Sequence, residues 1–274
     1  MDFTIGKYKK LLYALISKGY DFITFKQYIE NKENFNNKMI LILRHDVDFF
    51  PKYALNMALI ERKMGIKGSY YFRFNNRIFN DVVIKQIALL GHEIGYHYET
   101  MDKVINNELL NNNKNEFSSE EIIDKAYKLF VKELELFREV IDVKTICMHG
   151  SPKSKYDNKA IWNRFDYKKL GIVGEPYLDI DWNEFGYLTD TGRRWNGNKI
   201  NIRDKVKTKY VFDFKKTNDI LNNIDVLPTK LMITIHPKRW ADNPFLWSKE
   251  LIWQNIKNVF KFFRAKTIKD RKYF

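Results

Sequence analysis

Short apolar runs alternate with longer stretches in which apolar residues recur every three or four positions, as expected for β-strands separated by helices. The apolar runs predict strands over 39–45, 68–74, 92–97, 144–150, 171–176, 184–190, 208–214 and 230–237. The amphipathic stretches predict helices over 51–64, 81–90, 119–139, 157–169, 217–224 and 248–264. Strands separated by helices favour βα units and a mainly parallel sheet, and with about seven such units we expect the sheet to curl into a barrel.

Residues that start or end helices support these boundaries. Pro51 suits the first position of a helix, and Gly65 suits the position after its end. Asp81 can cap the next helix, and Ser118 with Glu121 forms the pattern of a capping box. These signals predict where three of the helices begin.

The pattern indicates one domain over 1–274, with no internal repeat and no Gly/Ser-rich or Pro-rich linker. Residues 1–38 predict a helical and extended segment packed on the barrel, and its first helix lacks the long apolar region of a signal peptide. No apolar run approaches the roughly 20 residues of a membrane span. With Cys147 as the single cysteine, these features favour a cytoplasmic protein without an internal disulfide.

Charged and polar residues follow the predicted strands where each strand ends. In the stretch LILRHDVDFF the apolar run leads directly into Arg44, His45, Asp46 and Asp48. Other strand ends carry Arg73, His97, His149, Asp190 and His236. Because the carboxyl ends of parallel strands share one edge of a barrel, we expect these side chains to line one active site. The alternative is that the two aspartates cap the next helix and pair with Arg44.

Composition narrows the choice of partner. The chain has 45% apolar and 16% aromatic residues, which is too hydrophobic for a disordered protein. Its net charge of +14 favours nucleic acid, a membrane surface, or a phosphorylated or acidic sugar. Because it has no block of five or more consecutive basic residues and no nucleic-acid motif, we expect no nucleic-acid binding. The sequence indicates no oligomeric state.

Three motifs resemble those of the polysaccharide deacetylases, carbohydrate esterase family 4, whose shared module is the NodB homology domain. They are RHDVD after the first strand of the barrel, GHEIGYH about forty residues later, and ITIHP near the C-terminus. The resemblance extends over about residues 39–240. It implies a distorted (β/α) barrel that removes acetyl groups from N-acetylated sugars with one divalent metal. We expect zinc, with cobalt, manganese or nickel as alternatives.

The resemblance also implies roles for single residues. Asp46 corresponds to the general base and Asp48 to a metal ligand, although Val47 between them leaves the reverse assignment open. His97 corresponds to a histidine ligand, and His236 corresponds to the general acid that protonates the departing amine. For Asp190, which follows another strand, we expect a role in orienting either His236 or Arg193.

The chain departs from the family where a second histidine ligand is usual, because Met101 stands there. A thioether is a poor ligand for a hard or borderline metal. Two residues can replace it: His149, which we prefer because it keeps an imidazole ligand, and Glu99. His92, in the same motif as His97, is expected to pack and orient its loop instead of binding metal.

Six cations fall at or near the expected site: Arg44, Arg73, Arg193, Arg194, Lys238 and Arg239. Arginine binds phosphate and carboxylate oxygens in a bidentate manner, so we expect an anionic substrate. A nucleotide-diphosphate sugar, a lipid-diphosphate sugar or a glycan with uronic acid would fit. We expect Arg73 and Arg193 to contact it, with Trp195 forming an apolar wall, and at least one of Arg44 and Arg73 to be a buried partner of the aspartates.

The sequence therefore predicts a metal-dependent N-deacetylase acting on a precursor of a surface polysaccharide. One alternative is a deacetylase-like protein that binds glycan without catalysis. The other is a peripheral membrane protein that uses the basic, aromatic helix 248–264. We expect the apolar positions of this helix to dock on the barrel: Leu251, Ile252, Ile256, Val259, Phe260 and Phe263.

Overall fold

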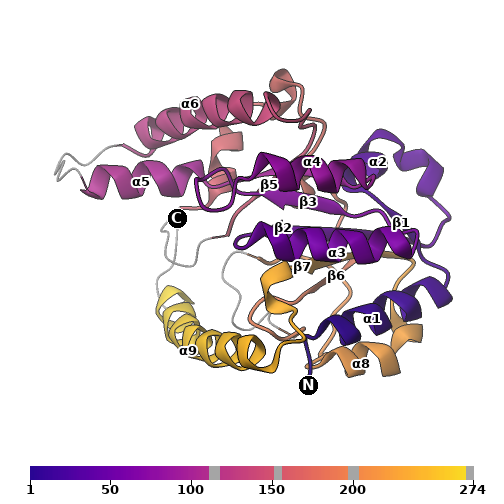
Figure 1. The fold of residues 1–274 in the computed structure, drawn as a ribbon. Helices are drawn as coiled ribbons and strands as arrows, with labels where there is room; N and C mark the ends of the chain where they lie inside the picture. The colour runs from indigo at the N-terminus through magenta and orange to yellow at the C-terminus, as the bar shows by residue number, and fades with distance from the viewer. Residues whose placement is uncertain (111–117, 151–155, 197–203, 270–274) are drawn as a thin grey trace.

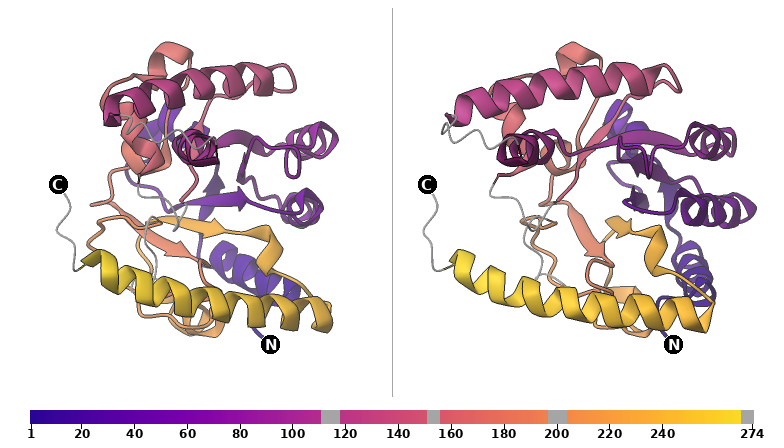
Figure 2. Two further views of the ribbon diagram at one scale, coloured as in Figure 1. Left: turned by 90° about the vertical axis from the view of Figure 1, so that its left-hand side faces the viewer. Right: turned by 60° about the vertical axis from the view of Figure 1, so that its left-hand side comes forward.

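A computed structural model describes residues 1–110, 118–150, 156–196 and 204–269, with only the backbone described at 108–110, 246 and 259–269. Seven parallel strands form one curled sheet with β5, β4, β3, β2, β7 and β6 side by side, while β1 pairs with the first half of β2 (Figures 1 and 2). The strands are β1 Asp21–Ile23, β2 Ile40–Val47, β3 Ser69–Phe72, β4 Glu93–Tyr98, β5 Ile146–Met148, β6 Phe185–Thr189 and β7 Lys230–Ile235. The α/β class and the distorted, incompletely closed barrel are confirmed.

Helices pack around this sheet and connect its strands. The α-helices are α1 Ile5–Ser17, α2 Phe25–Glu30, α3 Pro51–Lys63, α4 Asp81–Leu89, α5 Thr100–Leu110, α6 Ser119–Arg138, α7 Pro176–Asp179, α8 Thr217–Asn222 and α9 Pro244–Lys269. Pro51 occupies the first turn of α3, and Gly65 follows its end with a φ of 74°, a left-handed conformation that suits glycine. The capping box of Ser118 and Glu121 is formed, whereas α4 is capped by Asn80, one residue before the predicted Asp81.

Three predicted elements differ in the structure. The segment 171–176 contributes only an isolated bridge between Thr145 and Gly174, and 157–169 forms two 3-10 helices, Asn158–Asn163 and Tyr167–Leu170. The segment 208–214 has alternating exposure but no regular structure. Alternating apolar and polar residues indicate that one side of a segment is buried. They do not require a neighbouring strand with which the segment pairs.

Side-chain alternation along β2 explains where the site forms. Leu43 and Val47 face α3 on the outside of the curled sheet, whereas Ile40 and Ile42 point inside, where they pack with Met232 and other apolar side chains. Because side chains alternate along a strand, Arg44, Asp46 and Asp48 continue this inward row. The interior is therefore apolar near the start of the strands and charged near their carboxyl ends.

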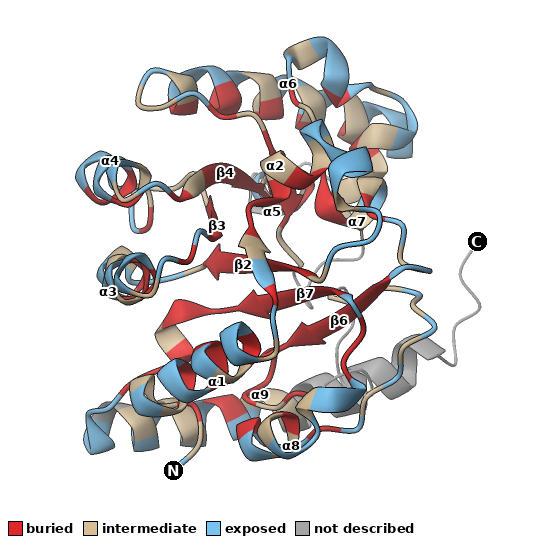
Figure 3. Ribbon diagram, turned by 90° about the vertical axis from the view of Figure 1, so that its right-hand side faces the viewer, coloured by how far each residue is buried: buried red, intermediate tan, exposed pale blue. Residues whose placement is uncertain are grey.

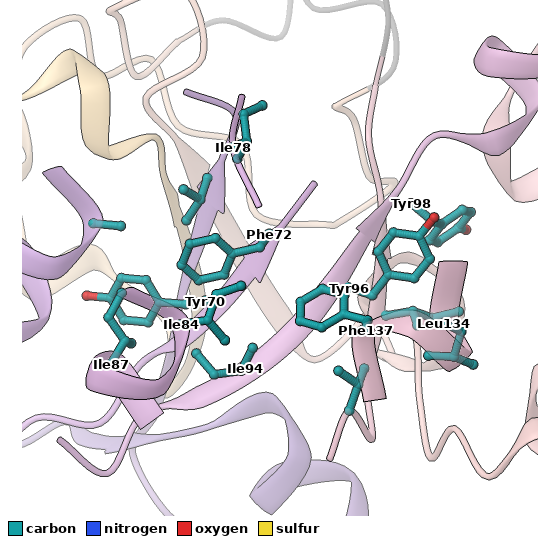
Figure 4. Packing of buried hydrophobic residues seen from close by; sticks show 14 of the residues in the cluster. Tyr70, Phe72, Ile78, Ile84, Ile87, Ile94, Tyr96, Tyr98, Leu134 and Phe137 are labelled. Atoms are coloured by element: carbon teal, nitrogen blue, oxygen red, sulfur yellow. The ribbon is translucent and has the colours of Figure 1, made fainter. Parts of the chain in front are cut away.

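The outer layer is held by aromatic and aliphatic packing. Tyr70, Phe72 and Tyr96 of the sheet pack against Ile84 and Ile87 of α4 and against α6 side chains (Figure 4). β2, β3, β5, β6 and β7 are buried along their whole length, while the helices expose one side (Figure 3). This rigid framework holds the charged carboxyl ends in place.

The N-terminal segment is part of the same body. β1 extends the sheet beside β2, and α1 buries Tyr8, Leu11, Leu12 and Leu15 in the cluster that also contains Leu231. Among the residues that the structure describes, no helix is long and apolar enough to cross a bilayer.

Candidate active site

The carboxyl ends of four strands bring three histidines around one carboxylate. Asp48 follows β2, His97 lies in β4, His149 follows β5 and His236 follows β7. The Nε2 atoms of His97 and His149 each lie 3.6 Å from Asp48 Oδ1, and Nε2 of His236 lies 3.9 Å from Asp48 Oδ2. The polar residues that the sequence placed at separate strand ends thus meet in one site.

The Asp48 carboxylate is held in its ionised form. Burial alone would raise its pKa, but electrostatic interactions with His149, His236, His97 and Arg73 outweigh this and lower the pKa well below the usual range for aspartate. Within the described part of the chain, Asp48 Oδ1 is buried and has no hydrogen-bond partner. An ionised, buried and unsatisfied oxygen facing two imidazoles is what a cation site requires.

His97 is oriented as a metal-binding imidazole. Its Nδ1 lies 2.9 Å from the carbonyl oxygen of Cys147, and because a carbonyl only accepts, Nδ1 carries the proton. Nε2 is then the free nitrogen, and it faces Asp48. Burial lowers the pKa of His97 to about 4, which favours the neutral form that binds metals.

His149 is supported from behind by a carboxylate. Its Nδ1 lies 3.1 Å from Glu99 Oε2, and the same oxygen accepts a hydrogen bond of 2.5 Å from Arg73. Burial would raise the pKa of Glu99, but its interactions with His149 and Arg73 lower it to about 2. Glu99 therefore holds His149, which leaves Nε2 of His149 facing Asp48.

Met101, which stands where the resembled family usually has a second histidine ligand, lies outside this site. Met101 is fully buried in an apolar cluster with Val104, Ile122 and Ile161. Its side chain packs α5 onto α6, so the position that usually supplies a histidine serves the core here. The predicted packing role of His92 agrees with its contacts, since its Nδ1 accepts from Gly68 N at 3.0 Å and its Nε2 lies 3.0 Å from the Ala58 carbonyl.

Asp46 lies beside Asp48 but has different partners. Its two oxygens accept hydrogen bonds from Nε and Nη2 of Arg44, each at 3.0 Å. Arg44 is fully buried, donates to the hydroxyl of Tyr177 at 2.8 Å and lies 3.8 Å from Asp204. This two-point contact fixes the plane of the Asp46 carboxylate.

A second grouping of possible donors overlaps this site. Asp46, His97 and Cys147 each offer one ligand atom within 4.8 Å of the other two. Burial raises the pKa of the Cys147 thiol, which disfavours the thiolate that binds metals. Asp46 is already paired with Arg44. Asp48 with His97 and His149 therefore offers the better donor types, although these three do not all lie within 4.8 Å of one another.

His236 is anchored by Asp190. Its Nδ1 lies 2.6 Å from Asp190 Oδ1, and its backbone N–H donates to Oδ2 at 2.9 Å. Asp190 also accepts from Arg239 and from the Trp240 indole, each at 2.7 Å. Burial would raise the pKa of Asp190, but the charges of Arg239 and His236 lower it. Of the two partners expected for its side chain, Asp190 orients His236.

The structure does not bring Arg193 and Trp195 into the site. The Arg193 guanidinium lies over the rings of Phe3 and Trp247, at 5.6 and 5.0 Å, and Trp195 is buried with its indole donating to Thr217. Both side chains therefore pack within the protein, and the expectation that they contact substrate is wrong. Arg194 donates to Asn196 and is likewise engaged.

Phe49, beside the site, carries no signal in the sequence patterns. Phe49 lies between two cations, with Arg73 5.9 Å and Lys238 3.8 Å from its ring. Burial lowers the pKa of Lys238 to about 8, although Asp48 opposes this shift. Phe49 and Arg73 also line a pocket of about 500 Å³. Its other lining residues are Asn75, Asn76, Arg77 and Ile78.

Asp204 is a further acid near the site, and it is half-buried. It accepts hydrogen bonds from the hydroxyls of Tyr177, Tyr187, Thr189 and Thr191. It follows β6 by fifteen residues, in a segment without regular structure, so no strand-end pattern points to it.

Comparison with known proteins gives matches among solved structures alone. No family model and no curated protein matches the chain. The chain is similar to BA3943 from Bacillus anthracis, described as a CE4 family pseudoenzyme, at 14% identity over 86% of this chain and 63% of that one, with a TM-score of 0.41. It is also similar to a BA3943 mutant with restored enzymatic activity, at 14% identity over 82% and 64%, with a TM-score of 0.41. The chain thus spans less than two thirds of these structures, which come from the family that the motifs resemble.

Proposed function

We propose that this protein is a metal-dependent hydrolase that removes the acetyl group from an N-acetylated sugar. The observation that carries this proposal is Asp48 Oδ1, a buried and unsatisfied carboxylate oxygen 3.6 Å from Nε2 of both His97 and His149. Two ligands of a tetrahedral zinc ion with bonds of ~2.0–2.2 Å lie roughly 3.4 Å apart, so the distance from Asp48 to each imidazole suits a shared ion. The two imidazoles, which are farther from each other, would move together on binding it.

Asp48, His97 and His149 would hold this metal, with the Cys147 carbonyl and Glu99 orienting the two imidazoles. When bound, a zinc ion supplies a Lewis acid for the acetyl carbonyl and lowers the pKa of a water molecule. Three protein ligands leave a position open for that water, as in other catalytic zinc sites.

Two proton-transfer groups flank the metal ligands. Asp46, fixed by Arg44, would act as the general base that takes a proton from the attacking water. His236, fixed through Nδ1 by Asp190, would use Nε2 to protonate the departing amine. The bidentate contact with Arg44 favours Asp46 as base and Asp48 as ligand over the reverse assignment, because both Asp46 oxygens already have a partner.

A role in glycan binding without catalysis gains no support from these contacts. Binding a sugar does not require a buried carboxylate that orients a histidine beside a cation site. The Asp190–His236 pair and the Arg44–Asp46 pair have a direct use in amide hydrolysis.

The substrate would carry a negative charge near the reacting amide. Arg77 is exposed in the pocket beside Phe49, where Arg73 and Lys238 add positive charge. A nucleotide-diphosphate or lipid-diphosphate sugar, or a glycan with uronic acid, offers the phosphate or carboxylate that arginine binds best. A precursor of a surface polysaccharide combines these features with an N-acetyl group.

Release of acetate tests the proposed function. The protein loaded with Zn²⁺ is expected to release acetate from an N-acetylated sugar nucleotide, and removal of the metal with a chelator should stop the reaction until Zn²⁺ is added back. Acetate can be measured by NMR or by an enzyme-coupled assay. Stoichiometric metal binding without acetate release from any charged or neutral N-acetylated sugar would contradict the proposal.

Charge selectivity is tested at Arg77. Arg77→Gln should raise KM for the anionic sugar by about tenfold while leaving kcat within about twofold, because a charge-assisted hydrogen bond contributes roughly 1.5–3 kcal/mol to binding. Added salt should raise KM in the parent and less so in the variant. Arg62→Gln, an exposed arginine on α3, is the matched control and should change neither constant. Equal efficiency on neutral chito-oligosaccharides with no salt effect would exclude an anionic substrate.

A further inference from the structure

Helix α9 is attached to the rest of the protein by a mostly polar side. The Trp247 indole donates to the Asp2 carbonyl at 2.6 Å, and the Asn258 amide donates to the Gly192 carbonyl at 2.9 Å. Gln254, between them along the helix, is 2% exposed and donates to Asn258 at 2.8 Å. The side of α9 that faces the protein thus buries an amide where a packed helix usually buries aliphatic groups.

The other side of α9 exposes large apolar residues. Phe245, Ile252, Trp253 and Ile256 are 75%, 63%, 57% and 45% exposed. With Ser248 and Lys249, the first three line an apolar groove of about 400 Å³. These positions are spaced by seven, one and three residues, which places them along one face of the helix.

This arrangement corrects the expectation that the apolar positions of the helix dock on the barrel. Ile252 and Ile256 face solvent, and Leu251 is half-buried. The side chains of Val259, Phe260 and Phe263 lie outside the described residues. Four large, exposed apolar side chains along one helix face are typical of a surface that binds another protein or a membrane. α9 lies at the periphery of the molecule (Figures 1 and 2).

Charge decides between the possible occupants. Lys249 is exposed beside the groove, and Lys257 lies 5.8 Å from the Trp253 ring. Glu250 is the one acidic residue in Pro244–Asn258, and it is half-buried. A second copy of the chain, with a net charge of +14, would bring lysine against lysine across this face. A surface of anionic headgroups instead complements the lysines while its acyl boundary accepts the aromatic and aliphatic side chains.

We propose that the outer face of α9 binds an anionic membrane surface. Phe245, Ile252, Trp253 and Ile256 would enter the headgroup layer, with Lys249 and Lys257 at lipid phosphates. The helix would lie along the surface, in keeping with the finding that none of the described helices can span a bilayer. Binding does not depend on hydrolysis, so this proposal and the proposed function can fail separately.

Vesicle binding by the full chain tests this surface. The protein should sediment with vesicles of phosphatidylcholine containing about 30% phosphatidylglycerol, and much less with phosphatidylcholine alone, because both charge and apolar insertion contribute. Ile252→Ser with Trp253→Ser should lower the fraction bound to anionic vesicles by about tenfold, as expected when the inserted apolar area is lost. The matched control, Val82→Ser with Leu89→Ser, removes two exposed apolar side chains from α4 and should bind like the parent.

Circular dichroism and the Tm of both double variants show whether they remain folded. A Lys249→Gln variant should keep the fold and weaken the dependence of binding on salt. No binding of the parent to anionic vesicles would overturn the proposal. A parent dimer that dissociates in the Ile252/Trp253 variant, without vesicle binding, would also overturn it and make a second copy the occupant. Equal loss of binding in the α4 control would show that α9 is not the binding face.

Discussion

Asp46→Asn and His236→Ala are each expected to lower kcat by about 10²-fold or more, while the protein still binds one equivalent of metal. Asparagine keeps the shape of the carboxylate that Arg44 holds but cannot accept a proton from water. Alanine at 236 removes the imidazole that protonates the leaving amine. Neither change removes Asp48, His97 or His149, so metal content should stay that of the parent.

Turnover and metal content must be measured on the same preparations. Steady-state acetate release gives kcat and KM, and elemental analysis gives the metal per chain. Asp225→Asn is a suitable control, because this exposed aspartate pairs with Lys18 far from the site and its loss should leave kcat unchanged. Loss of metal from Asp46→Asn together with its retention in Asp48→Asn would reverse the assigned roles of the two aspartates.

The sequence predicted the site well where a side chain belongs to a strand or its immediate end. Parallel strands carry such residues to one edge, so Asp48, His97, His149 and His236 converge without any further information. The alternation along β2 likewise explains why Asp46 and Arg44 share the inner side with Asp48. In regular structure, the position of a residue along its strand predicts where its side chain lies. Here this holds for residues from Asp48 to His236.

Prediction failed where the chain turns away from a strand end. After β6, Gly192 and Arg193 both have positive φ values, 82° and 56°, and the chain then carries Trp195 into the core beside Phe3. Two consecutive left-handed residues are not apparent from hydrophobic periodicity, which describes only regular elements. Arg193 and Trp195 follow the end of β6 closely in the sequence, but they do not lie close to the site in space.

The roles of the cations were also hard to predict from the sequence. Arg44 pairs with Asp46, as expected for at least one of Arg44 and Arg73, and Arg73 pairs with a different carboxylate, Glu99. A count of arginines near an expected site cannot distinguish a buried partner from a ligand-binding group. The groups that remain for an anionic substrate, Arg77 above all, become evident only from exposure and from the pocket beside Phe49.

The departure from the family pattern at Met101 leads to a prediction about metal affinity. His149→Ala should abolish stoichiometric zinc binding, because it removes one of the three proposed ligands, Asp48, His97 and His149. Glu99→Gln should weaken binding by only about 10–100-fold, the usual effect of losing a group that orients a ligand. Met101→His should not strengthen binding and should destabilise the fold, because the side chain is fully buried in an apolar cluster.

Zinc titration of the metal-free protein by calorimetry, with the Tm recorded for each variant, measures these effects. Glu93→Gln provides a matched control for Glu99→Gln, since Glu93 is half-buried at the other end of β4, where it accepts from the Ser69 hydroxyl at 2.6 Å. It should leave zinc affinity unchanged. Unaltered zinc affinity in folded His149→Ala, together with its loss in Glu99→Gln, would make Glu99 the third ligand. In that case the 3.1 Å contact between the two side chains would serve the reverse purpose, with the imidazole orienting the carboxylate.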